Sequence, residues 1–213
     1  MNSNCFVASL FEDQPALVDI SGRTPIKHTL PSAPRRSGLD KEYADSKQIA
    51  QDAKQATCIT VFSADGNHVF AGTNKGWLNI IETATQQTVY STRLCNGIIT
   101  YLRLTLSGRD MVSNSSDRVI RTLPLPDLSQ PGFDSDNLKV EVEHKFQDVV
   151  NRLSWNDVAF SSTGEYVTAS TYMNHDIYIW ERSHGSLVKI LEGPKEELGA
   201  VEVFLHQCVE DRF

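Results

Sequence analysis

The sequence predicts an all-β fold in which one antiparallel unit is repeated along the chain. Three segments align with one another, beginning at Cys58, Tyr101 and Asp157, and each is typical of strand, tight turn, strand, turn, strand. A glycine stands in the first turn of every copy: Gly66, Gly108 and Gly164. Glycine suits a hairpin that requires a positive backbone angle, so the turn chemistry and the repeat agree.

A fourth strand follows in each copy, at 87–93, 140–146 and 187–191. Four short antiparallel strands per repeat are typical of a propeller blade, although a sandwich or barrel can share the same turns. The spacing from Ile81 to Leu123 is 42 residues. Blades of the WD40 type repeat every ~40–45 residues, so the spacing favours a WD40-repeat β-propeller.

The dipeptide that names WD repeats is Trp-Asp, and Trp180-Glu181 occupies its position in the third copy. The other two copies are degenerate there, with Ile81-Glu82 and Leu123-Pro124. We expect the following residues to have structural roles in the repeat: Gly66, Gly108, Asp117, Gly164 and Trp180.

The alignment also predicts the organisation of the chain. We expect an incomplete propeller with about three full four-stranded blades and partial blades at both ends. The expected units are a partial blade at 1–20, an inserted loop that can form a short helix at 21–56, blades at 57–98, 99–148 and 149–193, and the start of a truncated blade with an atypical tail at 194–213. The second blade carries an insertion at 124–137, which is rich in proline.

Charge and cysteine content exclude several classes of function. The net charge of −7 predicts a poor general binder of nucleic acid, because phosphate affinity rests on clustered lysine and arginine. The four cysteines are far apart, so we expect reduced thiols and neither a metal nor a cofactor. No apolar run approaches the ~20 residues that cross a bilayer, and nucleotide and nucleophile motifs are missing. We therefore expect no membrane partner, no small-molecule substrate and no enzymatic activity.

For three groups of residues, a functional role competes with a simpler structural one. His175-Asp176 has the composition of a base with its orienting carboxylate, but polar residues in a predicted turn usually satisfy backbone groups. The three tryptophans suit a ligand cage less well than packing between blades. The tryptophans are Trp77, Trp155 and Trp180. The stretch 23–41 carries basic residues that suit a phosphate or simply a solvated loop: Arg23, Lys27, Arg35, Arg36 and Lys41.

A more specific signal is a family resemblance, strongest from Asp148 to Gly193. The run Val-Asn-Arg-x-x-Trp at 150–155 and the run Tyr-Ile-Trp-Glu-x-Ser-x-Gly-x-Leu-Val-Lys-Ile-Leu at 178–191 resemble the retinoblastoma-binding protein five family, called Swd-one in fungi. Weaker similarity continues upstream, so the resemblance covers most of residues 5–198.

The resemblance implies a nuclear, non-catalytic WD-repeat scaffold of COMPASS-type complexes, which methylate lysine four of histone H3. Its partners would be the SET-domain methyltransferase, the other COMPASS subunits and, through a local contact, the nucleosome. The family's DNA-facing arginine corresponds to Arg152, which can instead pair with Asp148 or Asp157. The family's acidic tail has no counterpart here, so we expect a fragment. The alternative function is a WD-repeat adaptor of an unrelated assembly, in ubiquitin ligation or RNA processing.

Overall fold

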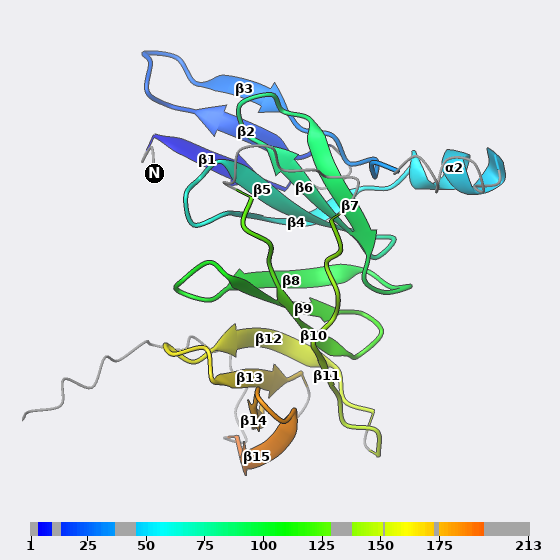
Figure 1. Cartoon of the computed structure of the whole chain (residues 1–213), viewed down its shortest axis with the longest axis vertical. Helices are drawn as coiled ribbons and strands as arrows, with labels where there is room; N and C mark the ends of the chain where they lie inside the picture. Colours follow the sequence, from blue (N-terminus) through cyan, green and yellow to red (C-terminus); the bar gives the residue numbers. More distant parts are fainter. Residues whose placement is uncertain are drawn as a thin grey trace, which may run out of the picture.

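The computed structural model describes residues 4–9, 14–36, 46–128, 138–150, 152–172 and 175–193. These residues form four antiparallel β-sheets and one short helix, α2 (Ser46–Asp52). Figure 1 shows the sheets following one another along the long axis of the molecule, in the order of the sequence. The predicted all-β fold is confirmed.

Three of the sheets have four strands each, and consecutive strands are neighbours in all of them. The second sheet contains β4 (Thr57–Phe62), β5 (His68–Thr73), β6 (Trp77–Glu82) and β7 (Thr88–Arg93). The third sheet contains β8 (Ile99–Leu104), β9 (Asp110–Ser115), β10 (Ile120–Pro124) and β11 (His144–Phe146). The fourth sheet contains β12 (Trp155–Phe160), β13 (Tyr166–Thr171), β14 (Ile177–Glu181) and β15 (Ser186–Leu191).

The first sheet has three strands, namely β1 (Cys5–Ala8), β2 (Ala16–Asp19) and β3 (Ile26–Thr29). The sequence predicted a loop where β3 lies, and that interpretation is wrong at these four residues. β3 pairs with β2 from Ala16 opposite Thr29 to Asp19 opposite Ile26. These four residues near prolines show too little alternation of apolar and polar side chains to indicate a strand. Formation of β3 therefore depends on its pairing with the neighbouring β2. The expected short helix is present as α2.

The fourth strand of the third sheet is shorter than predicted, because β11 has three residues where 140–146 was expected as strand. The preceding segment bonds elsewhere: the Val140 N–H donates to the Tyr90 hydroxyl of the second sheet (3.2 Å). The blade insertion begins after Pro124, and its residues 125–128 are described. Residues 129–137 of the insertion and the expected tail at 194–213 lie outside the described residues.

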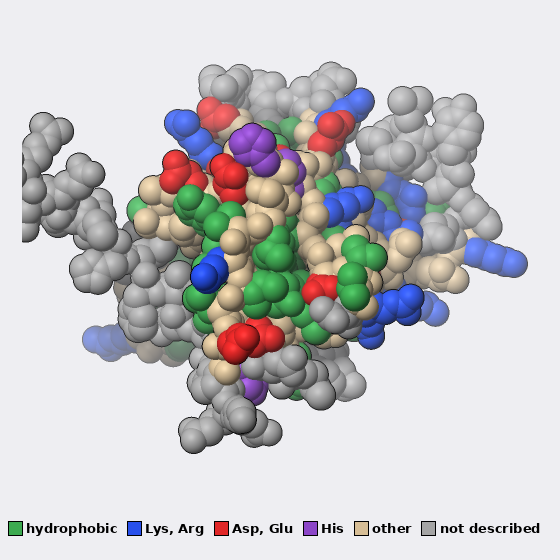
Figure 2. All heavy atoms as spheres, turned by 90° about the horizontal axis from the view of Figure 1, so that it is seen from below, with side chains coloured by type: hydrophobic (Ala, Val, Ile, Leu, Met, Phe, Trp, Pro, Cys, Tyr) green, Lys and Arg blue, Asp and Glu red, His purple; other side chains and the backbone are tan. Residues whose placement is uncertain are grey.

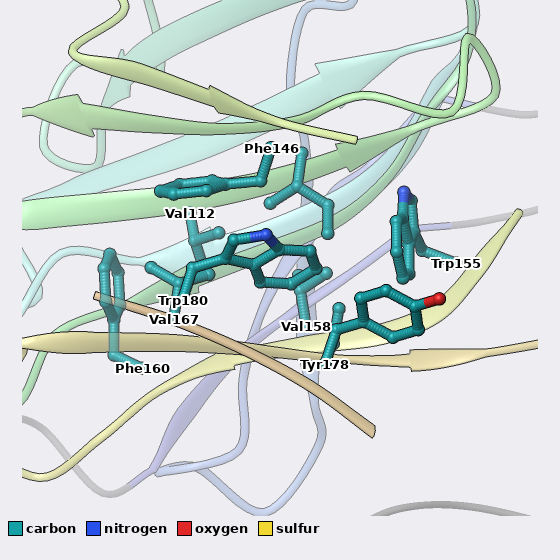
Figure 3. Packing of buried hydrophobic residues seen from close by; sticks show 10 residues of the cluster. Val112, Phe146, Trp155, Val158, Phe160, Val167, Tyr178 and Trp180 are labelled. Carbon is teal, nitrogen blue, oxygen red and sulfur yellow. The ribbon is translucent and has the colours of Figure 1, made fainter. Parts of the chain in front are cut away.

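Successive sheets meet along their first strands, as blades do around a propeller axis. β4 adjoins β8, and β8 adjoins β12. Each pair of sheets encloses its own apolar cluster. One of them joins the third and fourth sheets, and Figure 3 shows Trp180 in its middle, below Phe146 of the third sheet. The rings of Trp180 and Phe146 lie 5.4 Å apart, and those of Trp180 and Trp155 lie 5.3 Å apart.

The first turn of each four-stranded sheet has the backbone angle expected for glycine there. The φ angles are 77° at Gly66, 70° at Gly108 and 76° at Gly164. At Gly108 the glycine is also needed for space, because an added Cβ would lie 2.5 Å from the Ala64 Cβ in the neighbouring sheet's turn. Any residue other than glycine would therefore be strained at this position, both by the backbone angle and by the contact with Ala64.

Candidate functional site

Arg152 lies on the loop between β11 and β12, at the end of the sheets that also carries the β9–β10 and β13–β14 turns. These loops are tied to one another by backbone contacts. The Tyr172 N–H donates to the Ser154 carbonyl (3.0 Å), and the Ser116 N–H donates to the Ile98 carbonyl (2.8 Å). These two bonds lie within the fourth and the third sheet, and the Trp155 indole joins the two sheets by donating to the Arg118 carbonyl (3.0 Å). We call the surface made by these loops the Arg152 surface.

The Arg152 side chain is exposed and makes no hydrogen bond or ion pair with any described residue. Its φ angle is 50°, and its N–H donates to the Asp148 carbonyl (3.1 Å), so the backbone is held in a local turn. The two carboxylates considered as its partners are engaged otherwise. Asp157 pairs with Arg103 (3.0 Å), and Asp148 accepts from the Tyr178 hydroxyl (3.2 Å). Neither alternative pairing of Arg152 is therefore formed.

A second arginine, Arg118, lies on the β9–β10 turn, at the same end of the sheets, and was not singled out from the sequence. Its φ angle is 69°, and its carbonyl accepts a hydrogen bond from the Trp155 indole (3.0 Å). Its side chain is exposed and has no partner among the described residues. Both arginines thus have a left-handed backbone, which is uncommon at non-glycine residues and which Gln86 and His175 share.

The turn that carries Arg118 is organised by Asp117, one of the expected structural residues. The Asp117 carboxylate accepts from the buried Arg121 guanidinium and from the Ser115 hydroxyl. Partial burial alone would raise the pKa of Asp117, but the hydrogen bonds from Arg121 and Ser115 outweigh it and hold the pKa below its usual value. Asp117 is therefore ionised and fixed at neutral pH, and it positions the turn.

The remaining candidates have structural contacts. The Asp176 N–H donates to the Thr171 hydroxyl (2.9 Å), and its carboxylate accepts from the Gly193 N–H (3.1 Å), so this residue completes a turn. The described part of the chain contains no group of three or more His, Cys, Asp or Glu residues that could hold a metal ion, and so His175 and Asp176 belong to none. No helix found there is long and apolar enough to span a membrane.

The tryptophans do not come together as a cage. Trp155 and Trp180 are packed in the same cluster with 6% and 4% exposure, whereas Trp77 begins β6 of the second sheet. The guanidinium of Arg36 lies over the Trp77 ring, 5.8 Å from its centre, and pairs with Asp52 of α2. Arg35 donates to the Val89 carbonyl (2.7 Å). These two basic residues anchor the segment after β3, and Lys41 lies outside the described residues.

Comparison with known proteins connects this geometry to a family. No family model matches the chain. The Set1 complex component swd1 of Schizosaccharomyces pombe is 44% identical over 200 residues, covering 93% of this chain. The COMPASS component SWD1 of Saccharomyces cerevisiae is 33% identical over 90% of the chain. The retinoblastoma-binding protein 5 homolog of Drosophila melanogaster is 34% identical over 66% of it.

The matches cover less than half of each relative, namely 46%, 43% and 29% of their lengths. A solved structure, the β-propeller domain of Cps50 (Swd1) from Myceliophteria thermophila, aligns with a TM-score of 0.82 and 55% identity. The alignment covers 92% of this chain and 59% of that one. The fold is thus confirmed as part of a propeller, and the chain belongs to the family of Swd1 and the retinoblastoma-binding protein 5 homologues, a family of WD-repeat proteins.

Proposed function

We propose that the chain is a non-catalytic scaffold subunit of a nuclear COMPASS-type complex that methylates lysine four of histone H3. The observation that carries the proposal is the 44% identity to a Set1 complex component across 93% of the chain. The proposed partners are the SET-domain methyltransferase and the other subunits of that complex. Two relatives are named as components of Set1 or COMPASS complexes, and no feature of the described residues favours a ubiquitin-ligase or RNA-processing adaptor.

We further propose that the Arg152 surface contacts nucleosomal DNA. Arg152 and Arg118 are exposed cations without described partners on adjacent loops, in a protein whose net charge is −7. An arginine on a loop held by a rigid sheet can position a phosphate without reading sequence. Two such residues give a local contact, whereas the acidic remainder of the surface opposes general binding of nucleic acid.

Affinity purification of the tagged protein from its own cells tests the scaffold assignment. We expect a SET-domain methyltransferase to co-purify, and the eluate to methylate histone H3 at lysine four. Recovery of ubiquitin-ligase or RNA-processing subunits without a methyltransferase would overturn the assignment.

Charge reversal tests the nucleosome contact in the assembled complex. Arg152→Glu and Arg118→Glu should each weaken nucleosome binding and lower the slope of log affinity against log salt by about 1, as the loss of one phosphate contact requires. Arg23→Glu is the matched control, because Arg23 is an exposed arginine on the β2–β3 turn of another sheet. Equal affinities and slopes for wild type and both variants would remove the Arg152 surface from nucleosome binding.

A further inference from the structure

A cavity of about 410 Å³ lies between the second and third sheets, at the end of the strands opposite the Arg152 surface. Its sides are the β4–β5 turn, the β8–β9 turn and residues 125–128 of the blade insertion. The two turns touch at Gly108 and Ala64, as the close approach at Gly108 shows. The volume is within the range of about 300–1,000 Å³ that ligand sites occupy.

The first residues of the insertion line this cavity and are held to the third sheet by a defined contact. The Leu125 N–H donates to the Arg109 carbonyl (2.7 Å), which extends the pairing one residue beyond β10. Leu125 and Leu128 are half-buried and pack against the cluster that contains Phe70. The apolar wall of the cavity is therefore fixed by the core.

The inner part of the cavity holds a buried polar group that no described residue satisfies. His68 is 8% exposed, and its Nδ1 atom has no hydrogen-bond partner in the described part of the chain. The backbone of His68 is fixed, because its N–H donates to the Ser63 hydroxyl (2.9 Å) and its carbonyl accepts from the Ser63 N–H (2.8 Å). His68 is one of the residues that line the cavity, so its buried imidazole forms part of the inner wall.

The mouth of the cavity carries two carboxylates, Asp65 and Asp127, and one guanidinium, Arg109. Asp65 accepts from the Asn67 N–H (3.0 Å) and the Asn67 amide (2.8 Å), and also from Ser63. Although partial burial opposes it, the hydrogen bond from Ser63 and those from Asn67 keep the pKa of Asp65 below its usual value. Its charge is thus present and its position is set before any ligand arrives.

We propose that this cavity is a docking pocket for one basic side chain, lysine or arginine, from an extended segment of a partner protein. The methylene stem lies along Phe70 and Leu125, and the cationic head is directed to the two carboxylates at the mouth. Two carboxylates against one guanidinium give the mouth a net negative charge, and the whole chain is acidic, so charge complementarity favours a cation over an anion. The pocket is separate from the Arg152 surface and does not depend on the function proposed for it.

Fluorescence anisotropy with labelled heptapeptides of sequence Gly-Ser-Leu-X-Leu-Ser-Gly tests the pocket on the full chain. X is lysine, arginine, norleucine or glutamate. We expect the lysine or arginine peptide to bind at least about tenfold more tightly than the norleucine peptide, as one charge-assisted hydrogen bond provides. Asp127→Asn should weaken that binding, and Ser107→Trp, on the cavity wall, should abolish it.

The matched control is Glu165→Gln, which removes one carboxylate from the equivalent turn of the fourth sheet and should leave peptide binding unchanged. Thermal melting of each variant separates loss of binding from loss of folding. Equal binding of norleucine and lysine peptides, tighter binding of the glutamate peptide, or binding unaffected by Ser107→Trp in a folded variant would each overturn the proposal. Absence of binding by all four peptides would also overturn it.

Discussion

The two faces of the fourth sheet differ in how completely they are packed, although both are apolar in sequence. Consecutive residues of β14 point to opposite faces, and Trp180 and Tyr178 are buried against the third sheet, while Ile177 and Ile179 are half-buried on the other face. Figure 2 views this end of the molecule and shows apolar side chains gathered at its centre, between charged ones.

The second sheet shows what the more open face looks like when another sheet covers it. Leu78 and Ile80 occupy the positions that align with Ile177 and Ile179, and both have 0% exposure because the third sheet packs on them. The sequence pattern of the two strands is nearly the same. The difference in burial therefore comes from the neighbouring sheet and not from the strand itself. It predicts that truncating adjacent residues of β14 will lower the free energy of unfolding by unequal amounts.

The largest expected effect is at the packed face. Trp180→Ala should lower the free energy of unfolding by about 3–5 kcal/mol, because it removes a ring that contacts Phe146, Trp155 and Tyr178 and leaves a cavity. Ile179→Ala, one residue earlier, should cost about 1 kcal/mol or less, since its half-buried side chain loses little burial. Urea denaturation of both variants measures the two losses, and equal losses would show that both faces are packed alike.

A smaller effect is expected at the edge of the packed face, where Arg182 joins the third and fourth sheets. Its guanidinium donates to Asp110 (2.6 Å) and Glu143 (2.7 Å) and lies 5.7 Å from the centre of the Phe160 ring. The hydrogen bond with Asp110 is the main reason that the pKa of Arg182 is raised. Arg182→Met should cost about 1–2 kcal/mol, because it keeps much of the stem but leaves two carboxylates without their partner.

A double-mutant cycle of Arg182→Met with Asp110→Asn isolates the ionic part of this contact. We expect the second substitution to cost less in the Arg182→Met background than in the wild type, and the difference to shrink at high salt. Purely additive losses would mean that packing of the arginine stem on Phe160 stabilises this edge without the ion pairs.

The local signals in the sequence explain why the blades were predictable. Gly66, Gly108 and Gly164 follow polar residues at matching positions between alternating strands, and each is needed for its own turn. Trp180 was placed by its position in the repeat. The role of β3 was missed because so short a segment between two prolines forms a strand only when β2 is present.

The candidate sites were less predictable, because they depend on which turns become neighbours. The sequence directed attention to Arg152 through family resemblance, but the contact of its loop with the Arg118 turn, made by the Trp155 indole and the Arg118 carbonyl, joins two different sheets. The cavity beside His68 joins turns that are about 40 residues apart in the chain and an insertion that follows neither directly. No local pattern marks a site of that kind.

The smallest effect concerns Asp117. Its turn supports the packed face, because the carbonyl of the next residue, Arg118, accepts a hydrogen bond from the Trp155 indole. The folded-state pKa of Asp117 lies below its unfolded value of about 3.9, so its contribution to stability is present above that pH and is lost as pH falls through the folded pKa. Asp117→Asn should therefore cost under about 1 kcal/mol at pH 6, and the gap between variant and wild type should begin to narrow below about pH 4. Urea denaturation at a series of pH values measures this gap. A gap that stays constant down to pH 3 would show that the side chain acts through its shape and hydrogen bonds alone, and that its charge does not support the packed face.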